Sequence, residues 1–170
     1  MATPKLIVRK LTADSRGELL SLFERMDGDS RYRRFGMPMS RDGLCAYVQR
    51  LDFSRDLVSG AYDGDRLIGV CEAVRYPGGL LVPVTELAFA VDPRYQGNKV
   101  GFRLGNQVFD VLPGQLVAVC AVANPPMAKL AHRLGMARAG RSAAHGLPTS
   151  VLEELASFHG LYVGQGRQVH

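Results

Sequence analysis

The residues best suited to chemistry lie between Val84 and Gly101, where an apolar strand pattern runs into a short polar loop and then into a helical pattern. The first backbone N–H groups of a helix have no partner inside it, and the helix dipole favours a negative group beside them. Arg94, Lys99 and Arg103 would add positive charge there. The spacing fits a pyrophosphate-sized anion site, and it fits an ordinary strand-to-helix turn with solvated charges equally well.

Two common nucleotide signatures are missing from this loop. It has no glycine five residues before Gly97, as the P-loop pattern requires, and no G-x-G-x-x-G run. Both of those site classes are therefore disfavoured.

The strand before the loop carries one carboxylate, Glu86, before Asp92 ends it. Side chains alternate across a strand, which gives a bulky face and a second face with smaller residues. The bulky face holds Thr85, Leu87, Phe89 and Val91, and the second holds Val84, Glu86, Ala88 and Ala90. Two alanines leave space beside Glu86, which is either a functional carboxylate or a surface carboxylate on a half-exposed strand.

The rest of the chain supplies elements that would position these residues. Strand patterns cover residues 6–11, 56–62, 66–76, 84–91 and 116–123, and residues 63–65 predict a hairpin turn. Helical spacing covers residues 15–26, 41–51, 100–112 and 125–134, with a shorter pattern at 151–158. Residues 31–40 read as an irregular basic segment. The order of these elements predicts one mixed α/β sheet.

The composition is that of an ordinary globular protein, with 46% hydrophobic and 22% charged residues among 170. No secretory pattern opens the chain, and the longest apolar run, residues 116–123, is far shorter than the roughly 20 residues of a membrane helix. We therefore expect a cytoplasmic protein of one domain.

The cysteines, histidines and net charge point to no further class of function. Three separated cysteines and four histidines lack ligand spacing, so no metal is expected. The net charge of +5 is spread along the chain, apart from Arg31, Arg33 and Arg34. That cluster reads more readily as a solvated loop than as a docking site, and a nucleic-acid partner is not expected on charge alone.

Two ordered motifs resemble the GNAT N-acetyltransferase family. Residues 85–101 (TELAFAVDPRYQGNKVG) resemble its Q/R-x-x-G-x-G/A acetyl-CoA motif after a strand, and residues 124–136 (NPPMAKLAHRLGM) resemble its N-x-x-M/A…L-G-F segment. Residues 31–35 and 67–70 are similar to the GNAT domains of bacterial protein-lysine acetyltransferases. The resemblance implies a GNAT fold, a mixed and mostly antiparallel splayed sheet flanked by helices. A single domain would span residues 1–170, with a divergent segment at 143–170.

The resemblance also implies a cofactor site for acetyl-CoA. Backbone groups of Phe89, Ala90 and Val91 would pair with the pantetheine arm, and Asn124 would lie beside that arm or only cap the helix after it. The pyrophosphate would lie on the loop formed by Gln96, Gly97, Asn98, Lys99, Val100 and Gly101. Glu86 matches the position of a general base in several members of the family, where it would take the proton of the attacking amine.

Two positions depart from the family pattern. Lys99 stands where the pattern has its middle glycine, and its side chain would either clash with the phosphates or neutralise them. Ala131 stands where many members carry a tyrosine that serves as general acid. Coenzyme A would then leave as a thiolate unaided, or His132 or a tyrosine elsewhere would serve as the acid.

The implied activity is transfer of an acetyl group from acetyl-CoA to a primary amine, by direct attack in a ternary complex. Protein lysine and a small-molecule amine are both open as acceptors, and the similarity at residues 31–35 favours lysine. The alternative is a catalytically weak acyl-CoA-binding sensor or interaction module with the same fold. Exposed strand edges are compatible with a homodimer.

Overall fold

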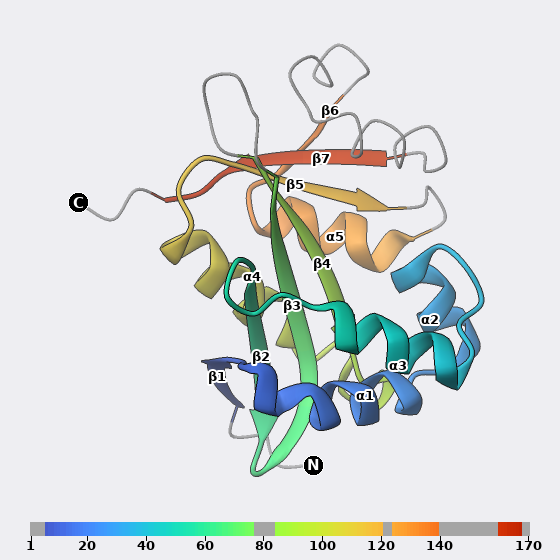
Figure 1. Cartoon of the computed structure of the whole chain (residues 1–170). Helices are drawn as coiled ribbons and strands as arrows, with labels where there is room; N and C mark the ends of the chain where they lie inside the picture. The colour runs from blue at the N-terminus through green and yellow to red at the C-terminus, as the bar shows by residue number, and fades with distance from the viewer. Residues whose placement is uncertain (1–5, 77–83, 121–123, 140–159, 168–170) are drawn as a thin grey trace.

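A computed structural model describes residues 6–76, 84–120, 124–139 and 160–167, which form one seven-stranded sheet with five α-helices (Figure 1). The strands are β1 Leu6–Lys10, β2 Leu57–Asp63, β3 Arg66–Tyr76, β4 Val84–Val91, β5 Gln115–Cys120, β6 Ala137–Ala139 and β7 Gly160–Gln165. The helices are α1 Arg16–Arg25, α2 Gly28–Phe35, α3 Arg41–Arg50, α4 Val100–Val111 and α5 Pro125–Arg133. Short 3-10 turns lie at Ala13–Ser15 and Pro93–Tyr95.

The sheet is mixed and opens in its middle. Its order is β1-β2-β3-β4-β5-β7-β6, and each described pair is antiparallel except β4 with β5. Strands β4 and β5 pair only from Val84 to Glu86 on β4, after which they diverge, as Figure 1 shows. The predicted fold, a mostly antiparallel sheet splayed after the fourth strand, is confirmed.

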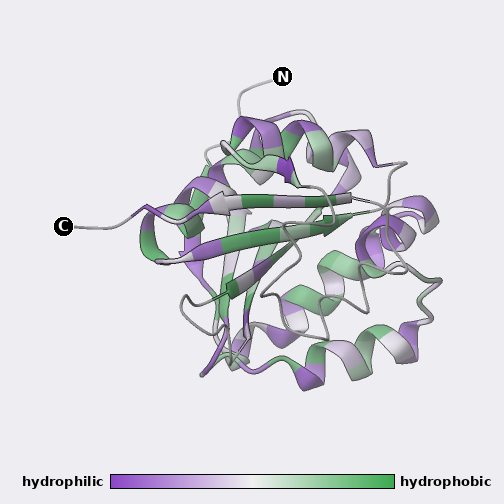
Figure 2. Ribbon diagram, turned by 90° about the horizontal axis from the view of Figure 1, so that it is seen from above, coloured by the Kyte–Doolittle hydropathy of each residue, from purple (hydrophilic) through white to green (hydrophobic). Residues whose placement is uncertain are grey.

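Helices cover both faces of the sheet (Figure 2). On one face, α4 and α5 pack on β2 to β5 through a core that includes Leu87, Leu104, Val108, Leu116 and Ala131. On the other, α1 and α3 pack on β2 to β4 through a core that includes Leu22, Phe23, Leu44, Val70 and Ala90. Leu87 and Ala90 lie in different cores, which confirms the predicted alternation of faces along β4.

The prediction that residues 31–40 are irregular is wrong for residues 31–35, which belong to α2 (Gly28–Phe35), and holds for residues 36–40. The Asp27 carboxylate accepts a hydrogen bond from the Ser30 N–H at 2.7 Å and caps the helix, and Gly36 ends it with a φ of 71°. An eight-residue helix is marginal alone, so tertiary contacts must stabilise it. The Phe35 ring supplies one of them, with edge contacts to Phe23 and Tyr47 at 5.3 and 5.1 Å between ring centroids.

Part of the divergent C-terminal segment completes the sheet. Strand β7 pairs antiparallel with β5 along its whole length and carries β6 on its other edge. Strand β5 was expected over residues 116–123. It is described from Gln115 to Cys120, and residues 121–123 lie outside the described part. The helix predicted at residues 151–158 also lies outside it.

Candidate functional site

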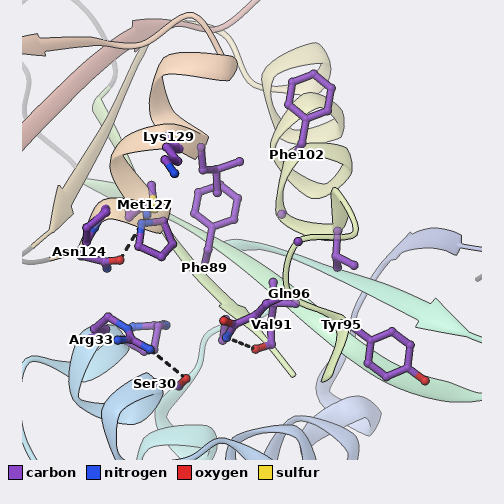
Figure 3. Close-up of a pocket in the computed structure, with 18 of the residues that line it drawn as sticks. Ser30, Arg33, Phe89, Val91, Tyr95, Gln96, Phe102, Asn124, Met127 and Lys129 are labelled. Atoms are coloured by element: carbon purple, nitrogen blue, oxygen red, sulfur yellow. Dashed lines mark hydrogen bonds between the residues drawn. The ribbon is translucent and has the colours of Figure 1, made fainter. Parts of the chain in front are cut away.

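A cleft of about 500 Å³ lies between β4, the loop that follows it, the first turn of α4, and the helices α2 and α5 (Figure 3). It contains nine of the eleven predicted site residues. These are Phe89, Ala90, Val91, Gln96, Gly97, Lys99, Val100, Gly101 and Asn124. The other two, Glu86 and Asn98, do not line it.

The first turn of α4 presents backbone N–H groups without a capping side chain. Lys99 is the N-cap residue and its side chain makes no capping hydrogen bond. Gly97 has a φ of 80°, which turns the loop sharply before the helix. Asn98 directs its amide back into the loop, toward the carbonyls of Tyr95 and Gln96 at 3.4 Å. A helix start of this kind suits an anionic ligand.

Lys99 adopts the left-handed backbone conformation, with a φ of 61°, and is the one non-glycine residue to do so in the described ranges. This explains why a family pattern has glycine at the same position, because a side chain costs free energy there.

We expect the free energy of unfolding of the Lys99→Gly variant, measured by urea denaturation, to be about 1 kcal/mol higher than that of the Lys99→Ala variant. Both variants lose the ammonium group, so the comparison separates backbone strain from charge. Equal stability of the two variants would contradict a strained backbone at this position.

The charges around the cleft are all positive among the described residues that line it. They belong to Arg33, Arg34, Lys99, Lys129 and Arg133, and no carboxylate lines the cleft with them. Together with the open start of α4, this arrangement fits a ligand with several negative charges. This positive lining is the feature of the site that fits a polyphosphate.

The edge of β4 is available on the side where β5 diverges. From Leu87 onward no described strand pairs with it there. One backbone group is already used, since the Gln96 Nε2 donates to the Val91 carbonyl at 3.2 Å (Figure 3). Across the cleft, Asn124 caps α5 by accepting from the Met127 N–H at 3.3 Å. Asn124 therefore both caps the helix and lines the cleft.

Glu86 lies on β4 three residues before the described wall of the cleft begins at Phe89. It is half-buried, and its Oε2 accepts a hydrogen bond from the Tyr76 hydroxyl at 2.6 Å. Its side chain shares a face of β4 with Ala88 and Ala90, and Ala90 belongs to the core under α1 and α3. The carboxylate is thus on the α1–α3 face of the sheet.

Sequence reasoning missed a buried ionic network on this same face. Glu72 of β3 lies opposite Ala88 and is 1% exposed. The Arg34 guanidinium of α2 forms an ion pair with it at 2.8 Å, and the Tyr47 hydroxyl of α3 donates to the same Glu72 oxygen. Arg34 also donates to the Tyr47 hydroxyl at 2.7 Å. The two alanines of β4 provide the space that these groups occupy.

The network changes the acidity of two of its members. Burial alone would lower the pKa of Arg34, but the facing Glu72 carboxylate and the Tyr47 hydroxyl offset this and raise it. Burial, together with the negative charge of Glu72, raises the pKa of Tyr47 above its ordinary value. Arg34 is therefore held charged and Tyr47 neutral.

Other features of the described ranges bear on metal and membrane function. Within them, no group of three or more His, Cys, Asp or Glu side chains could hold a metal ion. No helix there is long and apolar enough to cross a membrane. The three cysteines are free, and burial raises the pKa of Cys71 and of Cys120.

The sequence matches the profile of the acetyltransferase (GNAT) family over residues 20–136. No curated protein matches it.

Among solved structures, the fold is similar to the GNAT domain of S. lividans PAT, with a TM-score of 0.71 and 22% identity over 93% of this chain and 89% of that one. It is also similar to a ribosomal-protein-S5-alanine acetyltransferase from Vibrio fischeri (TM-score 0.62, 17% identity, 82% and 84% covered). A spermidine N-acetyltransferase from Vibrio cholerae in complex with CoA and spermine is a third (TM-score 0.61, 21% identity, 80% and 83% covered). At these identities, the similarities establish the fold.

Proposed function

Because the chain belongs to the acetyltransferase (GNAT) family, we propose that it transfers an acetyl group from acetyl-CoA to a primary amine, either a protein lysine or a small-molecule amine. One observation carries the proposal: a single cleft joins the uncapped start of α4 to the open edge of β4 at the splay of the sheet. Neighbours named for acetylation of spermidine and of a ribosomal protein support an amine as acceptor.

Different residues of the cleft would bind different parts of acetyl-CoA. The open N–H groups at the start of α4 would hold the pyrophosphate, and the ammonium of Lys99 would lie beside it. The unpaired edge of β4 from Phe89 to Val91 would hold the pantetheine arm, with Asn124 on the opposite wall. When bound, acetyl-CoA supplies an acetyl group activated as a thioester.

Glu86 would act as the general base for the amine. A primary amine is protonated near neutral pH and cannot attack until it loses a proton. The Glu86 carboxylate is half-buried, and the Tyr76 hydroxyl orients it. It lies on the same strand as the cleft wall, so an amine bound over Ala88 could lose its proton to Glu86 directly or through water.

The position at which many family members carry a tyrosine general acid does not open onto the cleft. Tyr95, the tyrosine among the described lining residues, donates its hydroxyl to Asp63 at 3.1 Å. Ala131 is fully buried in the core beneath α5, so its position does not face the cleft. His132 is exposed and does not line the cleft.

The binding site is tested by titration calorimetry with acetyl-CoA, with ATP as a control ligand. We expect Gly101→Glu to weaken the binding of acetyl-CoA by about tenfold or more, because it places a negative charge at the start of α4. Gly17→Glu is the matched control, since Gly17 lies in the first turn of α1 with no atom within 4 Å of an added Cβ. Equal affinity in the two variants would place the cofactor elsewhere.

Activity is tested by release of the coenzyme A thiol with a panel of lysine peptides and polyamines. Release with any amine supports the proposed function. Selective binding of acetyl-CoA without release on the whole panel would favour the second candidate, an acyl-CoA sensor. The left-handed backbone of Lys99 in the phosphate loop is the observation that favours this alternative.

A further inference from the structure

We infer that the amine acceptor is a lysine flanked by acidic residues, and that Arg33 of α2 recognises the flanking negative charge. This inference rests on the proposed function and names the substrate class for the same site. It starts from the distribution of charge between the two helices that border the cleft.

The two arginines that α2 brings to the cleft are in different states. Arg34 is neutralised by Glu72, and its side chain is only 10% exposed. Arg33 is exposed, and within the described part of the chain its side chain donates one hydrogen bond, to the Ser30 hydroxyl at 3.4 Å. Asp27 and Asp29 are the acidic residues beside it in the sequence, and among the described residues neither forms an ion pair with Arg33. The Asp27 Oδ1 caps α2 by accepting from the Ser30 N–H, and this hydrogen bond, together with the positive charge of Arg33, lowers the pKa of Asp27. The charge of Arg33 is therefore available to a ligand.

Arg33 lies on the side from which the amine would approach. Its neighbour Arg34 reaches Glu72, which is opposite Ala88 in the sheet. Ala88 is next to Glu86 on that face of β4, so α2 covers the face that carries the proposed base. Figure 3 shows Arg33 below Asn124, whereas Lys129 projects from α5 above it. The positive charges of Lys99, Lys129 and Arg133 belong to the loop and to α5, where the cofactor phosphates would lie.

The surface around Arg33 favours a peptide over a small polyamine. Tyr32 and Met37 are 54% and 57% exposed on the same short segment, so they can contact residues on either side of a lysine. A polyamine carries only positive charge and would be repelled by Arg33. An acidic peptide would be attracted by Arg33 and by the net charge of +5.

The test uses three peptides of equal length, each with one lysine, flanked by acidic, neutral or basic residues, together with spermidine. The kcat/KM of the wild-type protein should be highest for the acidic peptide and lowest for the basic peptide and spermidine. Arg33→Ala should lower kcat/KM for the acidic peptide by about fivefold, and Arg33→Glu should reverse the order of the acidic and basic peptides. Arg50→Ala removes the same charge from an exposed site at the end of α3, outside the cleft, and should change none of these values.

Added salt should reduce the preference for the acidic peptide by a larger factor in the wild-type protein and in Arg50→Ala than in Arg33→Ala, which keeps only the attraction of the overall positive charge. An unchanged order of peptides in Arg33→Glu would overturn the inference. A second result would also overturn it. If Arg33→Ala raised the dissociation constant of acetyl-CoA by the same factor by which it lowered kcat/KM for every peptide, Arg33 would bind the cofactor phosphates and not the peptide.

A failure of the proposed acetyltransferase activity can be distinguished from a failure of this inference about the peptide. If the wild-type protein acetylates nothing, peptide binding in the presence of coenzyme A is measured by fluorescence anisotropy. Tighter binding of the acidic peptide, lost in Arg33→Glu, would sustain the inference without the reaction. Equal binding of all three peptides would overturn it.

Discussion

Glu86→Gln is expected to lower kcat for amine acetylation by about a hundredfold near neutral pH, while the affinity for acetyl-CoA stays within about twofold. The amide keeps the size of the carboxylate and can still accept a hydrogen bond from the Tyr76 hydroxyl. It cannot accept the proton of the amine. The substitution therefore removes proton transfer and leaves the cleft, which Glu86 does not line, intact.

The loss should depend on pH, because an acceptor lysine has an ordinary pKa of about 10.4. Each unit of pH below that value lowers the fraction of free amine about tenfold. Without a base, the variant depends on amine that arrives deprotonated, so its deficit should be largest at low pH and should shrink as the pH rises. Steady-state rates with a lysine peptide between about pH 6 and about pH 9 measure this trend.

Glu18→Gln is a matched control for this prediction. Glu18 of α1 also accepts a hydrogen bond from a tyrosine, the Tyr62 hydroxyl at 2.7 Å, but it lies outside the cleft. Its substitution should leave kcat and the pH profile unchanged. If Glu86→Gln behaved like Glu18→Gln across the pH range, Glu86 would not be the base.

The sequence was informative wherever a local pattern decides the structure. Alternation along residues 84–91 predicted a strand with two different faces, and Leu87 and Ala90 do lie in separate cores. The apolar positions of residues 100–112 predicted α4 nearly to its ends, because one helical face packs on the sheet. The glycines and the open helix start predicted an anion-binding loop, and nine of the predicted residues do line one cleft, while the binding of a pyrophosphate there stays a prediction.

Features that depend on distant contacts were not predictable in this way. Helix α2 has few apolar residues, and its partners in the network, Tyr47 and Glu72, come from α3 and β3. Tyr47 and Glu72 are 25 positions apart in the sequence, so no spacing connects them. The two small residues Ala88 and Ala90 on one face of β4 were the available signal, since small residues leave room that a buried polar group can fill, and Ala88 lies opposite Glu72. Strand β7 was missed because its pairing with β5 crosses a long stretch of chain.

Removing Glu72 is expected to have the largest effect on stability. We expect Glu72→Ala to lower the free energy of unfolding by about 3–5 kcal/mol, measured by urea denaturation, because it leaves the buried charge of Arg34 without a partner. Glu24→Ala is the control, since it breaks the exposed ion pair of Glu24 with Arg41, with side chains 35% and 72% exposed. That change should cost less than about 1 kcal/mol.

Replacing both charges should cost less than removing one. The Arg34 Nε and Glu72 Oε1 atoms are buried and have no hydrogen-bond partner among the described residues, so the pair recovers only part of its desolvation cost. We therefore expect Arg34→Met with Glu72→Leu to lose only about 1–3 kcal/mol, the cost of leaving the Tyr47 hydroxyl without these two partners. An equal loss in Glu72→Ala and in the double variant would contradict this account, because the loss would then come from packing alone.

The double variant also tests whether the ion pair between Arg34 and Glu72 sets the position of α2 in addition to stabilising the fold. The ion pair fixes α2 on the β3–β4 face, and Arg33 comes next to Arg34 on the same helix. If the pair sets where Arg33 lies, the double variant should keep its affinity for acetyl-CoA but lose preference for an acidic peptide over a neutral one. If the double variant kept that preference, hydrophobic packing of Phe35 against Phe23 and Tyr47 would be sufficient to place the helix.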